Sequence, residues 1–229
     1  VVSRAMEQHL LALGAPRERL HYAVYGTDVE RFTPADPALA PPRFLAVGRF
    51  TDKKAPQLTL LAFRAAWLQR PEARLTMVGR GELWEGTRQL VKALGLEAGV
   101  ELPGVLSPEQ VAQHMRNARA FAQHSVTTSA NDMEGTPLAV LEAMASGLPV
   151  VSTRHAGIAD VVDHGVRGLL TDEYDIDAMA RHMVQLIDSP EQAGAMGRAG
   201  RAYVMEHHRM EDRIGALQAL LEKVVDQRS

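Results

Sequence analysis

Hydrophobic and polar positions alternate in short blocks from residue 43 onward, and these blocks predict strands and helices in turn. Short apolar runs predict buried strands at residues 44–47, 74–78, 100–102, 120–123, 149–152 and 168–171. Stretches with helical spacing lie between them, at residues 56–68, 83–94, 108–117, 137–144 and 158–164. Three further predicted helices, at residues 176–187, 190–207 and 210–225, close the chain. This alternation favours an α/β fold, a doubly wound parallel sheet with helices on both faces and additional C-terminal helices.

The segment before residue 43 has a different pattern. It predicts the end of a strand at residues 1–3, a helix over residues 4–13 that Ser3 caps and Gly14 ends, and a short strand at residues 19–24. Residues 34–42 are rich in proline, which is typical of a linker. We therefore expect residues 1–40 to be an inter-domain segment left from a missing N-terminal domain, and residues 41–229 to form the main domain.

Composition narrows the class of protein. The chain has 229 residues, of which 46% are hydrophobic, so it can bury a sizeable core. A net charge of −3 gives no basic surface for nucleic acid, and the lack of cysteine excludes disulfides and thiolate metal sites. We find neither a signal peptide nor an apolar run that could span a bilayer, and we expect a cytoplasmic protein.

Residues 134–152 carry the main functional signal. Pro137 suits the first position of a helix, and the residues after it are apolar on nearly every side, which predicts a buried helix. The free N–H groups and positive dipole end of such a helix suit an anion such as a phosphate. Glu142, a costly charge within the helix, would reach toward groups attached to that anion, and Glu134 would flank the anion from the preceding loop. The arrangement indicates a nucleotide sugar; a capped core helix with a solvated loop acid is the alternative.

Topology places a cationic cluster at the same position. In a doubly wound sheet of order 3-2-1-4-5-6, the first and fourth strands are neighbours, and ligands bind at their carboxyl ends. Arg49, Lys53 and Lys54 follow the first strand, and the fourth strand is followed by the loop that leads to Glu134. Arginine and lysine side chains that face a helix N-terminus would hold a diphosphate. A solvated surface cluster is the alternative.

Other candidate positions follow the remaining strands. Gly79 belongs to a Gly-Arg-Gly sequence that is either a tight turn or a ligand-facing loop, and its spacing differs from the dinucleotide-binding fingerprint. Val105 and Leu106 either pack against a nucleobase or belong to the core. No histidine spacing indicates a zinc site, and His124 and His155 lie at the expected ligand edge of the sheet.

Taken together, these motifs resemble a known family. The sequence from Glu134 to Val151, E-G-T-P-L-A-V-L-E-A-M-A-S-G-L-P-V-V, is similar to the Glu-x7-Glu signature of family 4 retaining glycosyltransferases. The similarity extends to Gly48-Arg49…Lys54, to Val78-Gly79-x-Gly81 and to residues 157–170, so it covers nearly the whole chain. The resemblance implies a GT-B architecture of two Rossmann-like domains, of which this chain would be the C-terminal, donor-binding one.

The resemblance also implies roles for individual residues. Arg49 and Lys54 would bind the diphosphate and neutralise the leaving group, and Glu134 would contact the transferred sugar. Glu142 would hold the ribose hydroxyls. Two groups of further positions are implied to bind the nucleotide sugar. Val105 and Leu106 would lie at the base, and the first group also includes Gly79. The second group is Gly135, Thr136, Leu138 and Ala139, and the backbone N–H groups of Leu138 and Ala139 would bind the phosphates. No metal would be needed, because the cations and the helix dipole would take its role.

One departure from the family pattern affects these assignments. Ala55 stands where the family usually has glycine after the phosphate-binding lysine, and Lys53 is adjacent, so either Lys53 or Lys54 contacts the phosphate. Among family members, the chain most resembles those of bacterial exopolysaccharide assembly. That resemblance identifies neither the nucleobase, the sugar nor the acceptor.

Three functions are compatible with the sequence. The first is the donor-binding half of a retaining glycosyltransferase that moves a hexose from a nucleoside diphosphate sugar to an acceptor, and the paired glutamates and cations favour it. The others are a sugar-nucleotide epimerase of the same architecture and a nucleotide-binding module without turnover. An acceptor sugar or lipid-linked sugar would be met by the missing N-terminal domain, and only the full-length protein would contact the inner membrane face. We expect the 229 residues alone to be inactive in transfer.

Overall fold

A computed structural model describes residues 1–226, and these residues form a six-stranded parallel sheet with flanking helices. The strands are β1 (Arg43–Val47), β2 (Arg74–Val78), β3 (Val100–Gly104), β4 (Ala120–Gln123), β5 (Val150–Thr153) and β6 (Gly168–Thr171). Their order is β3-β2-β1-β4-β5-β6, and every neighbouring pair is parallel. This confirms the doubly wound order predicted from the sequence, with β1 and β4 adjacent where the order reverses.

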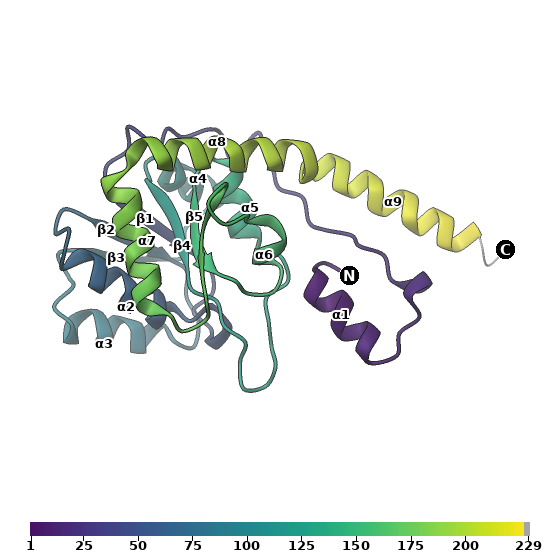
Figure 1. The fold of residues 1–229 in the computed structure, drawn as a ribbon, viewed down its shortest axis with the longest axis horizontal. Coiled ribbons are helices and arrows are strands. Elements are labelled where there is room, and N and C mark those ends of the chain that lie inside the picture. The colour runs from purple at the N-terminus through teal and green to yellow at the C-terminus, as the bar shows by residue number, and fades with distance from the viewer. Residues whose placement is uncertain (227–229) are drawn as a thin grey trace.

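The helices connect the strands and continue beyond the sheet (Figure 1). They are α1 (Arg4–Ala12), α2 (Pro56–Trp67), α3 (Trp84–Ala93), α4 (Pro108–Arg116), α5 (Leu138–Ala145), α6 (Ile158–Val161), α7 (Ile176–Asp188), α8 (Pro190–His207) and α9 (Met210–Asp226). Two short 3₁₀ turns, η1 (Arg17–Arg19) and η2 (Asp52–Lys54), complete the elements. Helix α9 extends from α8 away from the sheet, at the end of the molecule where α1 also lies.

In every strand except β3, successive residues enter two different hydrophobic clusters, one on each face of the sheet. Phe44 and Ala46 of β1 belong to the first cluster, which includes buried side chains of α2 and α7. Leu45 belongs to the second, which includes buried side chains of α4 and α5. Because neighbouring side chains of a strand point to opposite faces, a strand buried on both sides needs a continuous apolar run. This is why the apolar blocks in the sequence located the strands.

The segment before the sheet differs from the prediction in part. Ser3 caps α1 as expected, since its hydroxyl accepts a hydrogen bond from the Met6 N–H at 3.1 Å. The short strands predicted at residues 1–3 and 19–24 are wrong. These two extended stretches share the bonds Ala23 N–H to Val1 O and Val1 N to His21 O, but they have no further ladder and lie apart from the sheet.

Part of the predicted inter-domain segment packs into the core. Val29 and Phe32, each 3% exposed, belong to the second hydrophobic cluster. Further along, the Ala35 N–H donates to the Ser146 carbonyl at 2.7 Å, just after α5. Residues 29–35 are therefore attached to the face that carries α5. The division of the chain at residue 40 stays a prediction.

The segment that leads into the sheet domain and the segment that follows α8 lie side by side. Thr27 forms a parallel bridge with Arg209, and its N–H donates to the His208 carbonyl at 2.8 Å. A side chain at Gly26 has no room there, because an added Cβ would lie 2.5 Å from the Cα of Met210. The extended segment that leads into the domain is thus hydrogen-bonded to the junction between α8 and α9.

The predicted helix at residues 158–164 is shorter than expected. Helix α6 ends at Val161, because the chain turns back to pair with the start of β6. The Nδ1 atom of His164 accepts a hydrogen bond from the Leu170 N–H at 2.9 Å, and His164 forms a bridge with Gly168. These bonds replace the last helical turn that the pattern predicted.

Candidate functional site

The loops after β1 and β2 cross in close contact at the carboxyl edge of the sheet. The Gly48 N–H donates to the Val78 carbonyl at 3.0 Å, and the Gly79 N–H donates to the Gly104 carbonyl at 2.8 Å. Gly79 has a φ of 132°, and an added Cβ would lie 1.9 Å from the Gly48 carbonyl oxygen. Only glycine fits this crossing, so the Gly-Arg-Gly sequence forms the tight turn that was one of its two interpretations.

Lys54 and Glu134 form a buried ion pair at this edge. The Lys54 Nζ lies 3.1 Å from Glu134 Oε2, and the side chains are 16% and 8% exposed. The second carboxylate oxygen of Glu134 is buried and has no hydrogen-bond partner among the described residues. Burial lowers the pKa of Lys54, and the Glu134 carboxylate acts in the opposite direction. The pair therefore presents one free acceptor beside a cation.

The two adjacent lysines point to different acids. Lys53 pairs with Asp132 at 3.0 Å in a more exposed position, whereas Lys54 turns inward toward Glu134. The direction of Lys54 follows from the η2 turn and from Ala55, which adopts the left-handed conformation with φ 38°. Alanine thus takes the backbone conformation for which glycine is usually preferred, at a cost of about 1–2 kcal/mol.

The start of α5 faces the same space. Pro137 is the N-cap residue, with φ −64° and ψ 124°, so the prediction that it occupies the first helical position is wrong by one residue. Its extended ψ turns the chain into the helix, which begins at Leu138. Within residues 1–226, the N–H groups of Leu138 and Ala139 have no hydrogen-bond acceptor. They are free to bind an anion at the positive end of the helix.

A cleft of ≈ 480 Å³ joins these groups. Its walls include Gly48, Lys54, Glu134, Leu138 and Ala139, and also Gly135, Thr136 and Pro137. The Thr136 hydroxyl is already used, because it donates to the Val2 carbonyl at 3.0 Å. The cleft therefore combines a cation, a carboxylate and free helix N–H groups.

A second cavity of ≈ 240 Å³ lies beside the first and shares Gly48 with it. Its lining includes Arg49, Gly79, Val105 and Leu106, four of the positions singled out from the sequence. The Val105 side chain is 72% exposed, so the core interpretation of this residue does not hold. The Arg49 guanidinium makes no ion pair with any other residue in the range 1–226.

Glu142 lies on α5 and is half-buried, and its carboxylate makes no hydrogen bond or ion pair with the part of the chain that the structure describes. Burial raises its pKa, and the Arg31 guanidinium opposes this only in part. An unpaired carboxylate in this position costs stability unless a ligand pairs with it. This agrees with the sequence argument for a charge kept on an otherwise apolar helix.

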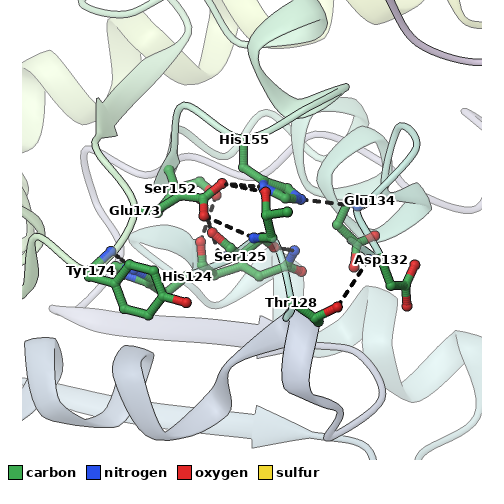
Figure 2. A network of polar contacts seen from close by, with 12 residues as sticks. His124, Ser125, Thr128, Asp132, Glu134, Ser152, His155, Glu173 and Tyr174 are labelled. Atoms are coloured by element: carbon green, nitrogen blue, oxygen red, sulfur yellow. Dashed lines mark hydrogen bonds and ion pairs between the residues drawn. The ribbon is translucent and has the colours of Figure 1, made fainter. Parts of the chain in front are cut away.

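A polar network supports the loop that carries Glu134 (Figure 2). The Glu134 N–H donates to His155 Nε2 at 3.0 Å, and His155 Nδ1 lies 2.6 Å from Glu173 Oε1. Glu173 also accepts a hydrogen bond from the Thr127 N–H at 2.8 Å. Burial alone would raise the pKa of Glu173, but the hydrogen bonds from His155 and Thr127 outweigh it and hold the pKa below its usual range.

His124 belongs to the support of the same edge and does not face the cleft. Its Nε2 accepts a hydrogen bond from the Tyr174 N–H at 2.9 Å, and its own N–H donates to Thr59 Oγ1 at 2.9 Å. Burial lowers the pKa of His124 to about 4, so the ring is neutral at pH 7. Its position in Figure 2 is that of a structural link between β4 and the loop after β6.

Comparison with known proteins assigns the chain to a family. Residues 31–203 match the model for glycosyl transferases group 1. The chain belongs to this glycosyltransferase family. It is 32% identical over 225 residues to the amylovoran biosynthesis glycosyltransferase AmsK of Erwinia amylovora, a match that covers 97% of this chain and 55% of that protein. It is also 28% identical over 231 residues to a GDP-mannose-dependent phosphatidylinositol monomannoside mannosyltransferase of Mycolicibacterium smegmatis, covering 96% of this chain and 60% of that protein.

Solved structures show the same fold. Sucrose-phosphate synthase of Thermosynechococcus elongatus superposes with a TM-score of 0.84 at 24% identity, covering 99% of this chain and 58% of that one. Anabaena HepE in complex with UDP-glucose gives a TM-score of 0.84 at 20% identity, covering 96% of this chain and 62% of that one. The chain thus has the Rossmann-like fold of one half of the GT-B architecture. It spans about half the length of the curated relatives it matches.

The structure of this glycosyltransferase chain brings most of the predicted site residues to one edge. Lys54, Glu134, Gly135, Leu138 and Ala139 line the larger cleft, and Arg49, Gly79, Val105 and Leu106 line the smaller one. Glu142 lies below the start of α5 and is not among the residues that line either cleft.

Sequence reasoning missed two residues at this edge. Glu173 belongs to the network that holds the backbone of Glu134, and its only signal in the sequence was a pair of acids, Asp172 and Glu173, after β6. Arg80 lies in the wall of the smaller cavity, with its guanidinium 4.9 Å from the centre of the Trp84 ring. Its signal was the cation inside the Gly-Arg-Gly sequence.

The described residues show neither a metal-binding cluster nor a membrane-spanning helix. Residues 1–226 contain no group of three or more His, Cys, Asp or Glu residues that could hold a metal ion. None of the helices in this range is both long enough and apolar enough to cross a membrane.

Proposed function

We propose that this chain binds the donor of a retaining glycosyltransferase that moves a hexose from a nucleoside diphosphate sugar to an acceptor. The observation that carries the proposal is the convergence at the larger cleft. A lysine, a buried carboxylate with one free oxygen and two free helix N–H groups line the same space. These groups suit a diphosphate joined to a hydroxyl-bearing ring.

The cations and the helix start take the phosphates in this proposal. The N–H groups of Leu138 and Ala139 hold phosphate oxygens, and Lys54 lines the same cleft. Arg49 approaches from the adjoining cavity with its guanidinium free. Together they stabilise the negative charge that the diphosphate gains as it leaves, which is the role a divalent metal takes in other enzymes. We accordingly propose transfer without a metal.

The two glutamates bind on either side of the phosphates. Glu134, with its free Oε1, faces the sugar and steadies positive charge at the anomeric carbon. Glu142 reaches from within α5 toward the ribose hydroxyls, which would pair with its carboxylate. The base lies in the smaller cavity against Val105 and Leu106. With the acceptor on the face that the diphosphate leaves, the anomeric configuration is retained.

The biological role that we propose is assembly of a bacterial exopolysaccharide. This is supported by the names of two relatives, the amylovoran biosynthesis glycosyltransferase AmsK and a putative colanic acid biosynthesis glycosyltransferase, WcaL of Escherichia coli, which is 35% identical over 195 residues. The acceptor, a sugar or a lipid-linked sugar, would be bound mostly outside this chain.

A nucleotide-binding panel tests the proposal. UDP, GDP, ADP and TDP are titrated into the chain and into Glu142→Ala, with Glu206→Ala on the exposed side of α8 as the matched control. A ligand at a hundredfold excess over its Kd raises the stability of the folded state by about 2.7 kcal/mol, which a thermal shift detects. We expect one nucleotide to stabilise the chain and the control alike, with a smaller shift in Glu142→Ala.

Two results would count against the proposal. No shift with any of the four nucleotides would remove the donor site from this chain. If the full-length protein converted the donor sugar to its epimer in place of transferring it, the reaction class would be wrong.

A further inference from the structure

The backbone of Glu134 is hydrogen-bonded to a histidine from the loop after another strand, β5. His155 follows β5 and is 1% exposed, and its Nε2 accepts the hydrogen bond from the Glu134 backbone N–H at 3.0 Å. The carboxylate of the same glutamate lies 3.1 Å from Lys54. The backbone of Glu134 is therefore held by His155 (Figure 2), while its side chain pairs with Lys54 and lines the larger cleft.

Glu173 fixes the tautomer of this histidine. Because Nε2 accepts a hydrogen bond, it carries no proton, and a neutral ring then has its proton on Nδ1. That N–H donates to Glu173 Oε1 at 2.6 Å. Glu173 is oriented in turn by the Thr127 N–H at 2.8 Å and the Thr127 hydroxyl at 3.2 Å. One carboxylate thus sets the tautomer of His155 and anchors the start of the loop that ends at Glu134.

The two loops also touch through their backbones. An added Cβ at Gly157 would lie 2.3 Å from the Gly135 carbonyl oxygen, so the chain after His155 packs directly on the chain after Glu134. Ala156, between these contacts, is held in the left-handed conformation with φ 40°. Residues 129–132, which lie between Thr127 and Glu134 in the chain, are exposed. The loop after β5 therefore supports the Glu134 loop through a side-chain hydrogen bond and a close backbone contact.

We propose that His155 is a positioning residue, and the inference rests on the proposed function. Its imidazole, oriented by Glu173, fixes Glu134, whose unpaired Oε1 would accept a hydrogen bond from the donor sugar beside Lys54. Without the bond to His155, the carboxylate can turn until both oxygens bind Lys54 or water, and the acceptor that faces the sugar is lost. The diphosphate contacts of Lys54 and the α5 N-terminus do not depend on His155.

The test compares two ligands that differ only by the sugar. Affinities for UDP and UDP-glucose, and for GDP and GDP-mannose, are measured with the wild-type protein, His155→Phe and His155→Gln. Phenylalanine keeps most of the ring volume but removes the acceptor, and glutamine places an amide oxygen near Nε2. Arg154→Ala is the matched control, since it alters the exposed neighbour in the same loop.

We expect His155→Phe to lower the affinity for the nucleotide sugar about tenfold, the value of one net hydrogen bond, with the affinity for the nucleoside diphosphate changed less than about twofold. His155→Gln should restore most of the sugar-dependent affinity, and Arg154→Ala should change neither affinity. A histidine that only stabilises the fold would weaken both ligands equally, and that result would overturn the inference.

A second measurement does not depend on how the variants fold. In the wild-type protein, nitrogen-15 NMR of the imidazole should show a protonated Nδ1 and a bare Nε2 for His155. The opposite tautomer would refute the assignment of the Glu134 bond. If no nucleotide binds the wild-type protein, the proposed function fails together with this inference. If nucleotides bind and His155→Phe keeps the wild-type preference for the sugar, only the positioning role fails.

Discussion

Two adjacent lysines offer a direct test of how burial strengthens an ion pair. Lys54 and Glu134 are separated by 3.1 Å, and Lys53 and Asp132 by 3.0 Å, so the geometric difference is negligible. The first pair has side chains 16% and 8% exposed, whereas the second has side chains 31% and 58% exposed. The perturbation is a double-mutant cycle on each pair, Lys54→Met with Glu134→Gln and Lys53→Met with Asp132→Asn.

The magnitudes follow from separation and burial. At about 3 Å and an effective dielectric constant of about 20, the attraction between unit charges is about 5 kcal/mol, and desolvation offsets part of it. We expect Lys54→Met to cost about 3 kcal/mol, because it leaves the Glu134 carboxylate buried with neither oxygen paired. The double variant should cost less than the sum of the singles, giving a coupling energy of about 2–3 kcal/mol. The exposed pair should give less than about 1 kcal/mol.

Urea denaturation of the four variants and the two double variants measures both coupling energies. Equal slopes of unfolding free energy against urea would show that the folded and unfolded states expose similar surface in each variant. A coupling energy below about 0.5 kcal/mol for Lys54 and Glu134, or one no larger than that of Lys53 and Asp132, would refute the reasoning. It would mean that the cleft is solvated well enough to screen the pair.

Three further predictions concern the backbone and the titration of single groups. Gly79→Ala should destabilise the fold by more than about 3 kcal/mol, because its Cβ would meet the Gly48 carbonyl. Gly86→Ala, on an open helix face, should instead raise the unfolding free energy by roughly 0.5–1 kcal/mol. Chemical denaturation of both variants distinguishes steric crowding at the crossing from the loss of glycine flexibility. The folded-state pKa of Glu142 is raised, so Glu142→Gln should stabilise the protein at pH 7 and have little effect well below the ordinary pKa; a gain that persists unchanged at pH 3 would contradict this. The pKa of His124 falls to about 4 from an ordinary 6.5, so as the pH falls the unfolded chain binds a proton before the folded chain does. Roughly 3 kcal/mol of stability should therefore be lost between pH 6.5 and pH 4. In thermal denaturation, His124→Gln should show a weaker dependence of stability on pH over this range.

The order of the sheet could be predicted because few topologies are allowed. Apolar blocks located the six strands, and right-handed crossovers between parallel strands left the doubly wound order as the simplest solution. The same rule placed Arg49 and Lys54 opposite the loop of Glu134, although these residues lie far apart in the chain. The convergence of the site was thus a consequence of topology, and no side-chain detail was needed.

The choice between Lys53 and Lys54 could not be made from the sequence. It depends on the 3₁₀ turn before α2 and on Ala55 in a left-handed conformation, which alanine seldom adopts. The contact between His155 and Glu173 could not be predicted from the sequence either. The two residues follow different strands, and their contact depends on how the two loops bend beyond the sheet. The short strands predicted near the N-terminus failed because the two stretches share only two hydrogen bonds with each other and lie apart from the sheet.

The bridge between Thr27 and Arg209 gives the sheet domain adjoining ends. Residues 27–209 therefore start and finish side by side, and this span contains all of residues 31–203, the family match. A unit of this kind can be inserted into a loop of another protein, or circularly permuted by joining its two ends, without stretching the chain. Most residues that line the larger cleft lie inside the span, but Val2, Met6 and Tyr25, which precede it, line the cleft too. A transfer of this unit to another protein would have to carry residues 1–26 as well, because Val2, Met6 and Tyr25 form part of the cleft wall.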